Sequence, residues 1–382
     1  MGRWLFTLTA VLGLAMTAGS GSATLWGQDK GGDDYTGPYN VVAGWPKPSR
    51  LAKSGQIFGS TSGIWAETPN RVITLYRGEI ILPERVNGRR VPPNFTGAFG
   101  ALGMQATSQV PDMRNCIVIL NAAGDIVEAW TQWDELFQDG RGPHQVIMSP
   151  YDPEHHVWIV DDMRHQIFKF TNDGKKLLLT LGESGIFGDN DDPTHFRRPT
   201  DIAFIKDGSF FVSDGYGNTR VLKFDKDGKF VKMWGTRGNK PGQFDTPHAI
   251  ATDRNGRVYV ADRSNDRIQI FDSDGKFLDQ WTNIRNPYTI RISEDGYAWI
   301  SSGVLNEFLK YDLNGKLLYH WGTYGTEPGE MWSVHEFSAD ADGNLYTAEV
   351  FGGRAQKFAP RAGADPAKIF RQQRLVPMNA TR

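Results

Sequence analysis

Short runs of alternating apolar and polar residues recur along most of the chain, a pattern that favours β-strands over helices. Each of the first four recurrences holds four such runs, and the last holds three. The segments that open them are GPHQVIMSP from Gly142, RPTDIAFIKDG from Arg198, TPHAIATDRNG from Thr246, NPYTIRISEDG from Asn286 and SVHEFSADADG from Ser333. The sequence therefore predicts a repeat protein in which each repeat is an antiparallel meander of short strands.

The dipeptides between the runs are those that tight hairpins prefer. Between the first and second runs stand Asp207-Gly208, Asn255-Gly256, Asp295-Gly296 and Asp342-Gly343. Between the third and fourth runs stand Asp173-Gly174, Asp227-Gly228, Asp274-Gly275 and Asn314-Gly315. Because Asp-Gly and Asn-Gly accept positive φ, they favour two-residue turns. Four hairpin-linked strands in about 40 to 55 residues form a β-propeller blade. Asp342-Gly343 also suggests a calcium loop, but its place in the repeat favours the turn.

A sixth, degenerate copy precedes the other five. It consists of TSGIWAETPNRVITLYRG from Thr61 and NCIVILNAAGDIVEAW from Asn115, with an insertion over roughly residues 79 to 114 between them. The last copy ends without a fourth strand, and an orphan strand at residues 39–45 can supply it and so protect the edges of the ring. We therefore predict an all-β fold: a six-bladed β-propeller over residues 39–358, closed by an N-terminal strand and followed by a C-terminal tail at residues 359–382.

The start of the chain has the features of an export signal. Arg3 precedes an apolar run at residues 4–16, and Gly21, Ser22 and Ala23 offer a signal-peptidase site. We expect residues 1–23 to be a signal peptide, residues 24–38 a flexible leader, and the mature protein to be secreted or periplasmic. The run is shorter than the roughly 20 residues of a membrane span, although a membrane anchor is the alternative interpretation.

Composition narrows the class of partner. The 39% hydrophobic and 12% aromatic content suffices for a packed core, and 43 glycines in 382 residues suit a fold with many turns. Lys+Arg 42 against Asp+Glu 44 leaves a net charge of −2, so no basic field favours nucleic acid. The single cysteine, Cys116, excludes a disulfide framework and a cysteine-based zinc site. We expect a monomer that binds neither nucleic acid nor, after signal removal, a membrane.

One repeat position carries histidine in alternate blades. Two places before the apolar anchor of the first strand, the six copies have Ser62, His144, Thr200, His248, Tyr288 and His335. Alternate blades of a six-bladed ring lie about 120° apart, so equivalent side chains converge on the central channel. Three histidines with an open fourth position are a common catalytic zinc site. Each histidine alone would more often be structural, but the shared alternating register favours a metal.

A second repeat position lies where the second strand ends. It holds Arg77 in LYRG, Tyr216 in SDGYGNTR and Arg263 in ADRSNDR. If these turns lie at the same end of the blades as the histidines, the two sets of side chains meet over the channel mouth. Arginine can grip a carboxylate, and tyrosine beside a metal and an arginine can act as a general base. Structural ion pairs with blade aspartates are the alternative for the arginines.

These segments resemble the peptidyl-α-hydroxyglycine α-amidating lyases, six-bladed propellers related to NHL-repeat proteins. The resemblance rests on HVWIVDDMRHQIFKF, PTDIAFIKDGSFFVSDGYGNTRVLKF, TPHAIATDRNGRVYVADRSNDRIQIF and LYRGE. It implies that the zinc ligands are His144, His248 and His335. It further implies that Tyr216 is the catalytic base and that Arg77 and Arg263 bind the substrate. A structural calcium is also implied, but Glu336 stands where the family has aspartate.

The activity that the resemblance implies is a carbon–nitrogen lyase reaction. An N-(α-hydroxyacyl) amide that carries a carboxylate, either a small molecule or a peptide, would be split into an amide and glyoxylate. One departure is that family members carry a disulfide beside the catalytic tyrosine, where this chain has Gly217. Two alternatives stay open: a non-catalytic secreted NHL-type propeller that binds protein or carbohydrate, and a metal-dependent propeller enzyme with a different reaction.

Overall fold

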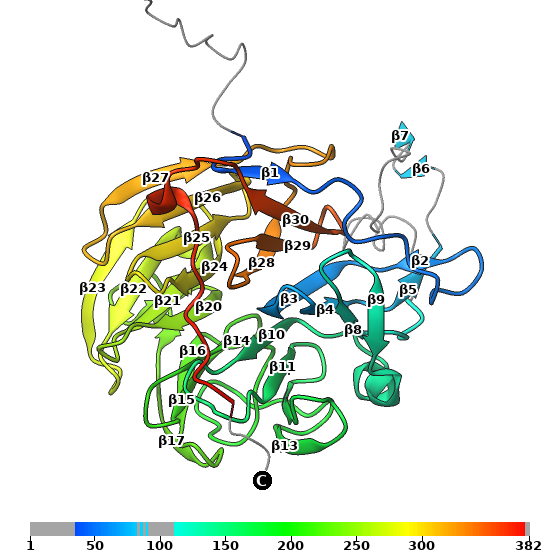
Figure 1. Ribbon diagram of the computed structural model, residues 1–382. Helices are drawn as coiled ribbons and strands as arrows, with labels where there is room; N and C mark the ends of the chain where they lie inside the picture. Colours follow the sequence, from blue (N-terminus) through cyan, green and yellow to red (C-terminus); the bar gives the residue numbers. More distant parts are fainter. Residues whose placement is uncertain (1–34, 82–84, 87–88, 91–110, 379–382) are drawn as a thin grey trace, which may run out of the picture. The chain divides into compact units, whose positions relative to one another are not determined.

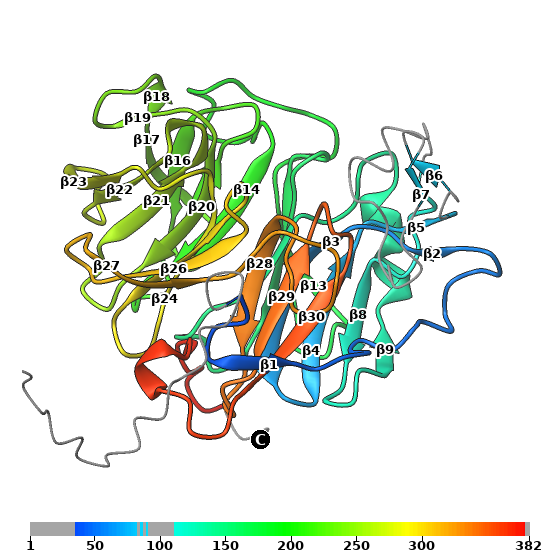
Figure 2. The same cartoon turned by 90° about the horizontal axis from the view of Figure 1, so that it is seen from above.

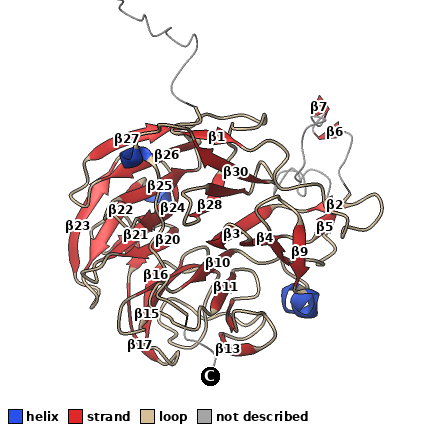
Figure 3. Cartoon of the chain, in the orientation of Figure 1, coloured by secondary structure: helices blue, strands red, loops and turns tan. Residues whose placement is uncertain are grey.

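The computed structural model describes residues 35–81, 85–86, 89–90 and 111–378, which all belong to one compact unit of the chain. The expected signal peptide, most of the leader and most of the insertion lie outside the described residues. The described part contains six four-stranded antiparallel sheets arranged around a central axis (Figures 1 and 2). Only short helical turns accompany them (Figure 3), and within these residues no helix could cross a membrane. The predicted six-bladed propeller is confirmed.

The sheets follow the predicted repeats. Blade one consists of β3 (Thr61–Thr68), β4 (Arg71–Tyr76), β8 (Ile117–Leu120) and β9 (Ile126–Ala129). Blade two consists of β10 (Gln145–Met148), β11 (Val157–Asp161), β12 (Gln166–Phe170) and β13 (Leu177–Leu181). Blade three consists of β14 (Pro199–Phe204), β15 (Phe210–Asp214), β16 (Arg220–Phe224) and β17 (Phe230–Trp234). Blade four consists of β20 (Pro247–Thr252), β21 (Val258–Asp262), β22 (Arg267–Phe271) and β23 (Phe277–Thr282). Blade five consists of β24 (Pro287–Ile292), β25 (Ala298–Ser302), β26 (Glu307–Tyr311) and β27 (Leu317–Trp321).

The sixth blade closes the ring as the sequence predicts. It combines β28 (Val334–Ala339), β29 (Leu345–Glu349) and β30 (Ala355–Pro360) with the N-terminal strand β1 (Tyr39–Val41). Strand β1 runs antiparallel to β30, with Tyr39 opposite Pro360 and Val41 opposite Phe358. The two ends of the propeller are thereby joined in one sheet, in which β1 covers the edge of β30.

Burial varies with position in the blade and explains the sequence pattern. The second strands, such as β11 and β15, are buried along their whole length, and they read as nearly continuous apolar runs. The fourth strands, such as β13 and β17, are only partly buried. Between blades the core is aromatic: Phe210 stacks on Phe224 at 5.2 Å between ring centroids, and Trp158 of the preceding blade lies 4.9 Å from Phe210. Packing between faces of neighbouring blades holds the ring together.

The eight predicted hairpin turns have the expected backbone. Their glycines adopt φ between +68° and +87°, the left-handed region that side chains other than glycine rarely enter. The first strands of blades two to six are also preceded by a residue with positive φ. These residues are Gly142, Arg198, Thr246, Asn286 and Ser333. Each lies two places before the position that the histidines share, so the backbone enters every one of these blades by the same bend.

The C-terminal segment packs against the propeller. After the short helical turn η3 (Pro366–Lys368), Phe370 is buried, and its backbone N–H donates to the Tyr39 hydroxyl at 2.9 Å. Further along, the N–H of Val376 donates to the carbonyl of Pro150 at 3.1 Å. Figure 1 shows this segment, in red, crossing the ends of the first strands. The predicted tail is thus an ordered strap over one end of the channel.

Candidate functional site

The three histidines of the shared register come together at the start of their strands, as predicted. His144, His248 and His335 are all buried, and their candidate ligand atoms lie within 4.8 Å of one another. The Nε2 atoms of His144 and His335 are 3.2 Å apart. Since the three residues come from blades two, four and six, their convergence follows from the alternation in the sequence.

Hydrogen bonds fix the orientation and tautomer of each ring. The Nδ1–H of His144 donates to the Thr200 carbonyl at 2.9 Å, and the Nδ1–H of His248 donates to the Tyr288 carbonyl at 2.7 Å. His335 donates in the same way to the Ser62 carbonyl at 2.7 Å. In each case the acceptor is the residue at the same repeat position in the next blade of the ring. Because Nδ1 carries the proton, all three Nε2 lone pairs face the axis, as in metal-binding histidines.

The electrostatics of this centre suit a cation. Burial, reinforced by the charge of Arg77, lowers the pKa of His335 to about 3. Burial also lowers the pKa of His144 and of His248 well below the ordinary value. The rings are therefore neutral at pH 7, the form that binds metals. Two lone pairs 3.2 Å apart repel each other unless a cation lies nearby, so these residues fit a bound metal ion.

Tyr216 lies against the histidines. Its hydroxyl is 2.7 Å from Nε2 of His248 and 3.1 Å from Nε2 of His144, and its single proton can serve only one of them. Nη1 of Arg263, from the turn after β21, donates to the same hydroxyl at 3.4 Å. The ends of the second strands and the starts of the first strands therefore meet, as predicted for Tyr216 and Arg263.

Arg77 is a buried cation without an anion. Its side chain is 3% exposed, Nε has no hydrogen-bond partner, and no carboxylate within the described residues pairs with it. Burial and the nearby Arg141 lower its pKa to about 10, and its charge acts on His144 and His335. A buried, unpaired guanidinium beside a metal site is suited to bind an anionic ligand.

Other arginines form the ion pairs that were the alternative for Arg77 and Arg263. Arg220 pairs with Asp214 at 3.0 Å, and Arg267 pairs with Asp262 at 2.8 Å. Both begin the third strand of a blade, whereas Arg77 and Arg263 follow the second strand. The blade aspartates are thus satisfied without the two arginines of the site.

Sequence reasoning missed three residues at the mouth: Arg141, Asp162 and Arg198. The guanidinium carbons of Arg141 and Arg198 lie 5.1 and 4.8 Å from the centroid of the Tyr216 ring, and both side chains pair with Asp162. Asp162 and Arg198 do stand at shared repeat positions, directly after the second strand and two places before the histidine register, but the residue type at these positions varies from blade to blade, so an alignment of blades does not single them out. The available signal was the proximity of Arg141 to His144 in the sequence.

The carboxylate expected to bind calcium is already paired with a cation of the chain. Nη2 of Arg291 donates to Glu336 at 2.6 Å, and Nη1 donates to Asp201 at 2.9 Å. All three residues are buried. Burial raises the pKa of both carboxyl groups, and the guanidinium between them opposes that rise. A calcium ion at Glu336 would have to displace Arg291, so these residues do not fit the expected calcium site.

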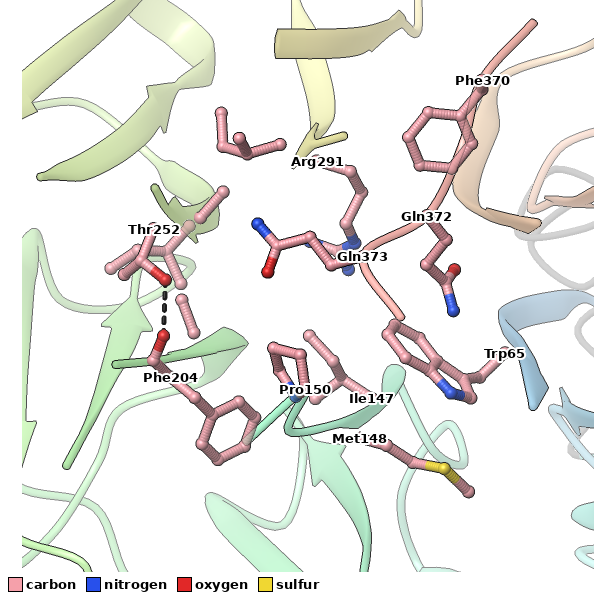
Figure 4. A pocket seen from close by; sticks show the side chains of 14 residues that line it. Trp65, Ile147, Met148, Pro150, Phe204, Thr252, Arg291, Phe370, Gln372 and Gln373 are labelled. Carbon is pink, nitrogen blue, oxygen red and sulfur yellow. Dashed lines mark hydrogen bonds between the residues drawn. The ribbon is translucent and has the colours of Figure 1, made fainter. Parts of the chain in front are cut away.

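Arg291 also borders a cavity at the far ends of the first strands. Figure 4 shows it with Gln372 and Gln373 of the C-terminal strap and with Trp65, Ile147 and Phe204 from the inner strands. The cavity volume is about 60 Å³, which leaves little room for a ligand. The channel is therefore closed at this end by an internal ion triad and the strap.

The ion triad of Arg291, Asp201 and Glu336 predicts that the stability of the folded protein does not depend on calcium. We expect the melting temperature of the wild-type protein to be unchanged by a calcium chelator or by added calcium. Arg291→Ala should lower the stability by about 3–5 kcal/mol, because two buried carboxylates lose their counter-ion. Calcium should then raise the melting temperature of that variant.

Arg267→Ala is the matched control for this experiment. It removes another buried arginine, one whose partner is the single carboxylate of Asp262, so it should destabilise the protein without creating a response to calcium. A wild-type melting temperature that falls on chelation would contradict the prediction. Both effects are measured by thermal unfolding.

Comparison with known proteins places the chain in context. A family model described as a 6-bladed beta-propeller matches residues 191–313. Peptidyl-glycine alpha-amidating monooxygenase B of Xenopus laevis is 28% identical over 320 residues, which cover 79% of this chain and 34% of that protein. Peptidyl-alpha-hydroxyglycine alpha-amidating lyase 1 of Drosophila melanogaster is 30% identical over 264 residues, which cover 59% of this chain and 46% of that protein. The chain thus spans about a third to a half of these relatives.

Further similarities concern the fold. Proteins named for NHL repeats are also among the relatives. A solved structure of streptogramin B lyase has a TM-score of 0.53 at 13% sequence identity and covers 85% of this chain and 98% of that one. The chain is therefore a six-bladed β-propeller related to the peptidyl-α-hydroxyglycine α-amidating lyases and to NHL-repeat proteins.

Proposed function

We propose that this chain is a zinc-dependent carbon–nitrogen lyase, which splits an N-acyl-α-hydroxyglycine into an amide and glyoxylate. The observation that carries the proposal is the meeting of three buried, inward-facing Nε2 atoms with the hydroxyl of Tyr216. The relationship to amidating lyases supports the same reaction. Secretion is part of the proposal and rests on the sequence of residues 1–23 alone.

The donor set favours zinc over calcium or magnesium, because imidazole nitrogen binds zinc well and the hard cations prefer oxygen. The ligands would be Nε2 of His144, His248 and His335. When bound, zinc supplies a Lewis acid that makes the substrate hydroxyl more acidic. The carbonyl acceptors on Nδ1 keep the three rings in place during the reaction.

Tyr216 moves the proton in this scheme. The scheme requires the phenolate form of Tyr216, which accepts the proton of the substrate hydroxyl, and the Arg263 guanidinium, 3.4 Å away, would stabilise that phenolate. The electron pair of the O–H bond forms the aldehyde C=O, and the C–N bond breaks. The nitrogen leaves as the amide after it takes up the proton from Tyr216. No oxidant and no water are consumed.

The substrate carboxylate needs a cation that no protein carboxylate already occupies. Arg77 meets this requirement, because it is buried at the site and has no carboxylate partner within the described residues. Binding of the substrate carboxylate to Arg77 would hold the substrate α-carbon near the metal site.

The test is metal analysis followed by an assay for glyoxylate. The purified protein, stripped of metal and then given zinc, should retain about one ion per chain after gel filtration. It should release glyoxylate from an N-acyl-α-hydroxyglycine only when loaded, and the assay uses both N-benzoyl- and N-succinyl-α-hydroxyglycine so that neutral and acidic acyl groups are covered. Failure to retain zinc would overturn the proposal in favour of a binding propeller. Zinc retention without glyoxylate release would indicate a different metal-dependent reaction.

A further inference from the structure

Two arginines at the mouth are held rigidly by one buried carboxylate. Asp162 is fully buried, and Arg141 donates to its two oxygens from Nε at 3.1 Å and from Nη2 at 2.8 Å. Arg198 donates to Oδ2 of Asp162 from Nε at 3.1 Å and from Nη2 at 2.7 Å. Both guanidinium groups are thus oriented by a fork-shaped contact, whereas their side chains stay partly exposed.

This contact leaves Nη1 of each guanidinium group outside the ion pair with Asp162. In both arginines the bonds to Asp162 use Nε and Nη2, so Nη1 makes no contact with that carboxylate. Both groups also pack over the ring of Tyr216, on which Arg263 packs as well. Both guanidinium groups therefore lie beside the residue that we place at the reacting atoms, and the side chain of Arg141 also hydrogen-bonds to Tyr216.

Positive charge exceeds negative charge at this mouth. Four arginines, Arg77, Arg141, Arg198 and Arg263, lie around Tyr216 and the histidines, and Asp162 is the carboxylate that pairs with two of them. Asp161 is a second carboxylate here: one oxygen accepts from the N–H groups of Met163 and Arg164, the other is buried without a hydrogen-bond partner among the described residues, and burial raises the pKa of this group to about 7. The four arginines therefore outnumber the two carboxylates. A substrate with one carboxylate would neutralise only one of the remaining charges.

Arg77 and Arg141 are close neighbours, because the backbone between Arg141 and His144 passes tightly over Arg77. A Cβ atom at Gly142 would lie 3.0 Å from the Cα of Arg77, a tight contact that glycine avoids. Burial lowers the pKa of Arg77, and repulsion by the nearby guanidinium of Arg141 adds to that effect. An anionic ligand between or beside them would relieve that repulsion.

We infer that the site takes a compact dianion, in which Arg141 binds a second carboxylate close to the one held by Arg77. The inference rests on the proposed function, and it makes the acyl part of the substrate a short acid rather than a neutral group or a long peptide. Arg141 is a specificity-determining residue, and Asp162 is a positioning residue that acts through it.

Binding of unreactive acids tests the inference without the reaction. Isothermal titration of zinc-loaded protein at fixed ionic strength compares glutarate with butyrate, which differ by one carboxylate. We expect glutarate to bind at least tenfold more tightly, and Arg141→Gln to reduce that ratio to about threefold or less. Arg141→Lys should restore part of the preference, because it keeps the charge but loses the fork.

Arg164→Gln is the matched control, since Arg164 is a partly exposed arginine on the same loop as Asp162 and bonds to Ser184 instead. It should leave the preference for glutarate unchanged. Equal affinities of the wild-type protein for the two acids would overturn the inference. So would a preference that survives Arg141→Gln in protein whose thermal unfolding shows an intact fold.

Kinetics separate this inference from the proposed reaction. Glyoxylate release is compared for N-succinyl- and N-butyryl-α-hydroxyglycine, and Arg141→Gln should raise KM for the succinyl substrate at least tenfold more than for the butyryl one. If neither is cleaved but the glutarate preference depends on Arg141, the lyase proposal fails and the dianion site stands. If both are cleaved equally well, the lyase proposal stands and the dianion site fails.

Discussion

His248→Ala is expected to reduce bound zinc from about one ion per chain to near zero and to lower glyoxylate release by about 10³-fold or more. The substitution removes one of three converging Nε2 donors, and the two that are left form a much weaker site. It also removes the contact at 2.7 Å that orients the Tyr216 hydroxyl. Elemental mass spectrometry after gel filtration measures the first effect, and a glyoxylate assay measures the second.

The fold should survive this change. His248 lies at the start of its strand and faces the channel, so the packing between blades is untouched. His320→Ala is the matched control, because His320 lies on the outer strand β27 and pairs with Glu307 far from the channel register. Zinc content and turnover should both match the wild type in that variant. A His248→Ala protein that keeps its zinc would refute the assignment of the metal centre.

Tyr216→Phe is expected to lower turnover by about 10²- to 10⁴-fold while zinc content stays the same. The change deletes one oxygen, the atom that would accept the substrate proton. The ring stays, with its packing against Arg141, Arg198 and Arg263, so the mouth should keep its shape. The measurement is kcat on zinc-loaded protein, with metal content determined on the same sample.

Retained zinc distinguishes this variant from His248→Ala, since the two changes affect different parts of the mechanism. Tyr324→Phe, at an exposed tyrosine that contacts Trp332, removes the same atom elsewhere and should leave turnover unchanged. Turnover within about threefold of wild type in Tyr216→Phe would exclude this residue as the base and require another proton acceptor.

Much of the fold was predictable because its determinants are local. Each Asp-Gly or Asn-Gly pair specifies a hairpin through its own backbone preference, and the glycines do adopt positive φ. The last repeat lacks a fourth strand, and an orphan strand precedes the first repeat. Together these two observations predicted the pairing of β1 with β30. The alternating histidines were predictable for a related reason: a repeat turns equivalent sequence positions into equivalent positions in space.

The residues around the histidines could be predicted only where they share a repeat position. Tyr216 and Arg263 follow the second strand of their blades and reach the site as expected. Arg141 belongs to no such set, and although Arg198 and Asp162 do, the ion pairs among these three residues depend on contacts between different turns. Nothing local in the sequence indicates that these three side chains meet.

By itself, the sequence determined six blades, their order, the closing strand and the convergence of three histidines, since backbone preferences and repeat register are enough to specify them. Only the tertiary structure decided which charges are paired. Arg291 binds both Asp201 and Glu336, residues 90 and 45 positions away, and thereby fills the place that the family resemblance gave to calcium. Arg77 pairs with no carboxylate among the residues that the structure describes, and its Nε has no hydrogen-bond partner there. Pairing of this kind depends on distances between side chains of different blades, which the ring fixes only once it has closed.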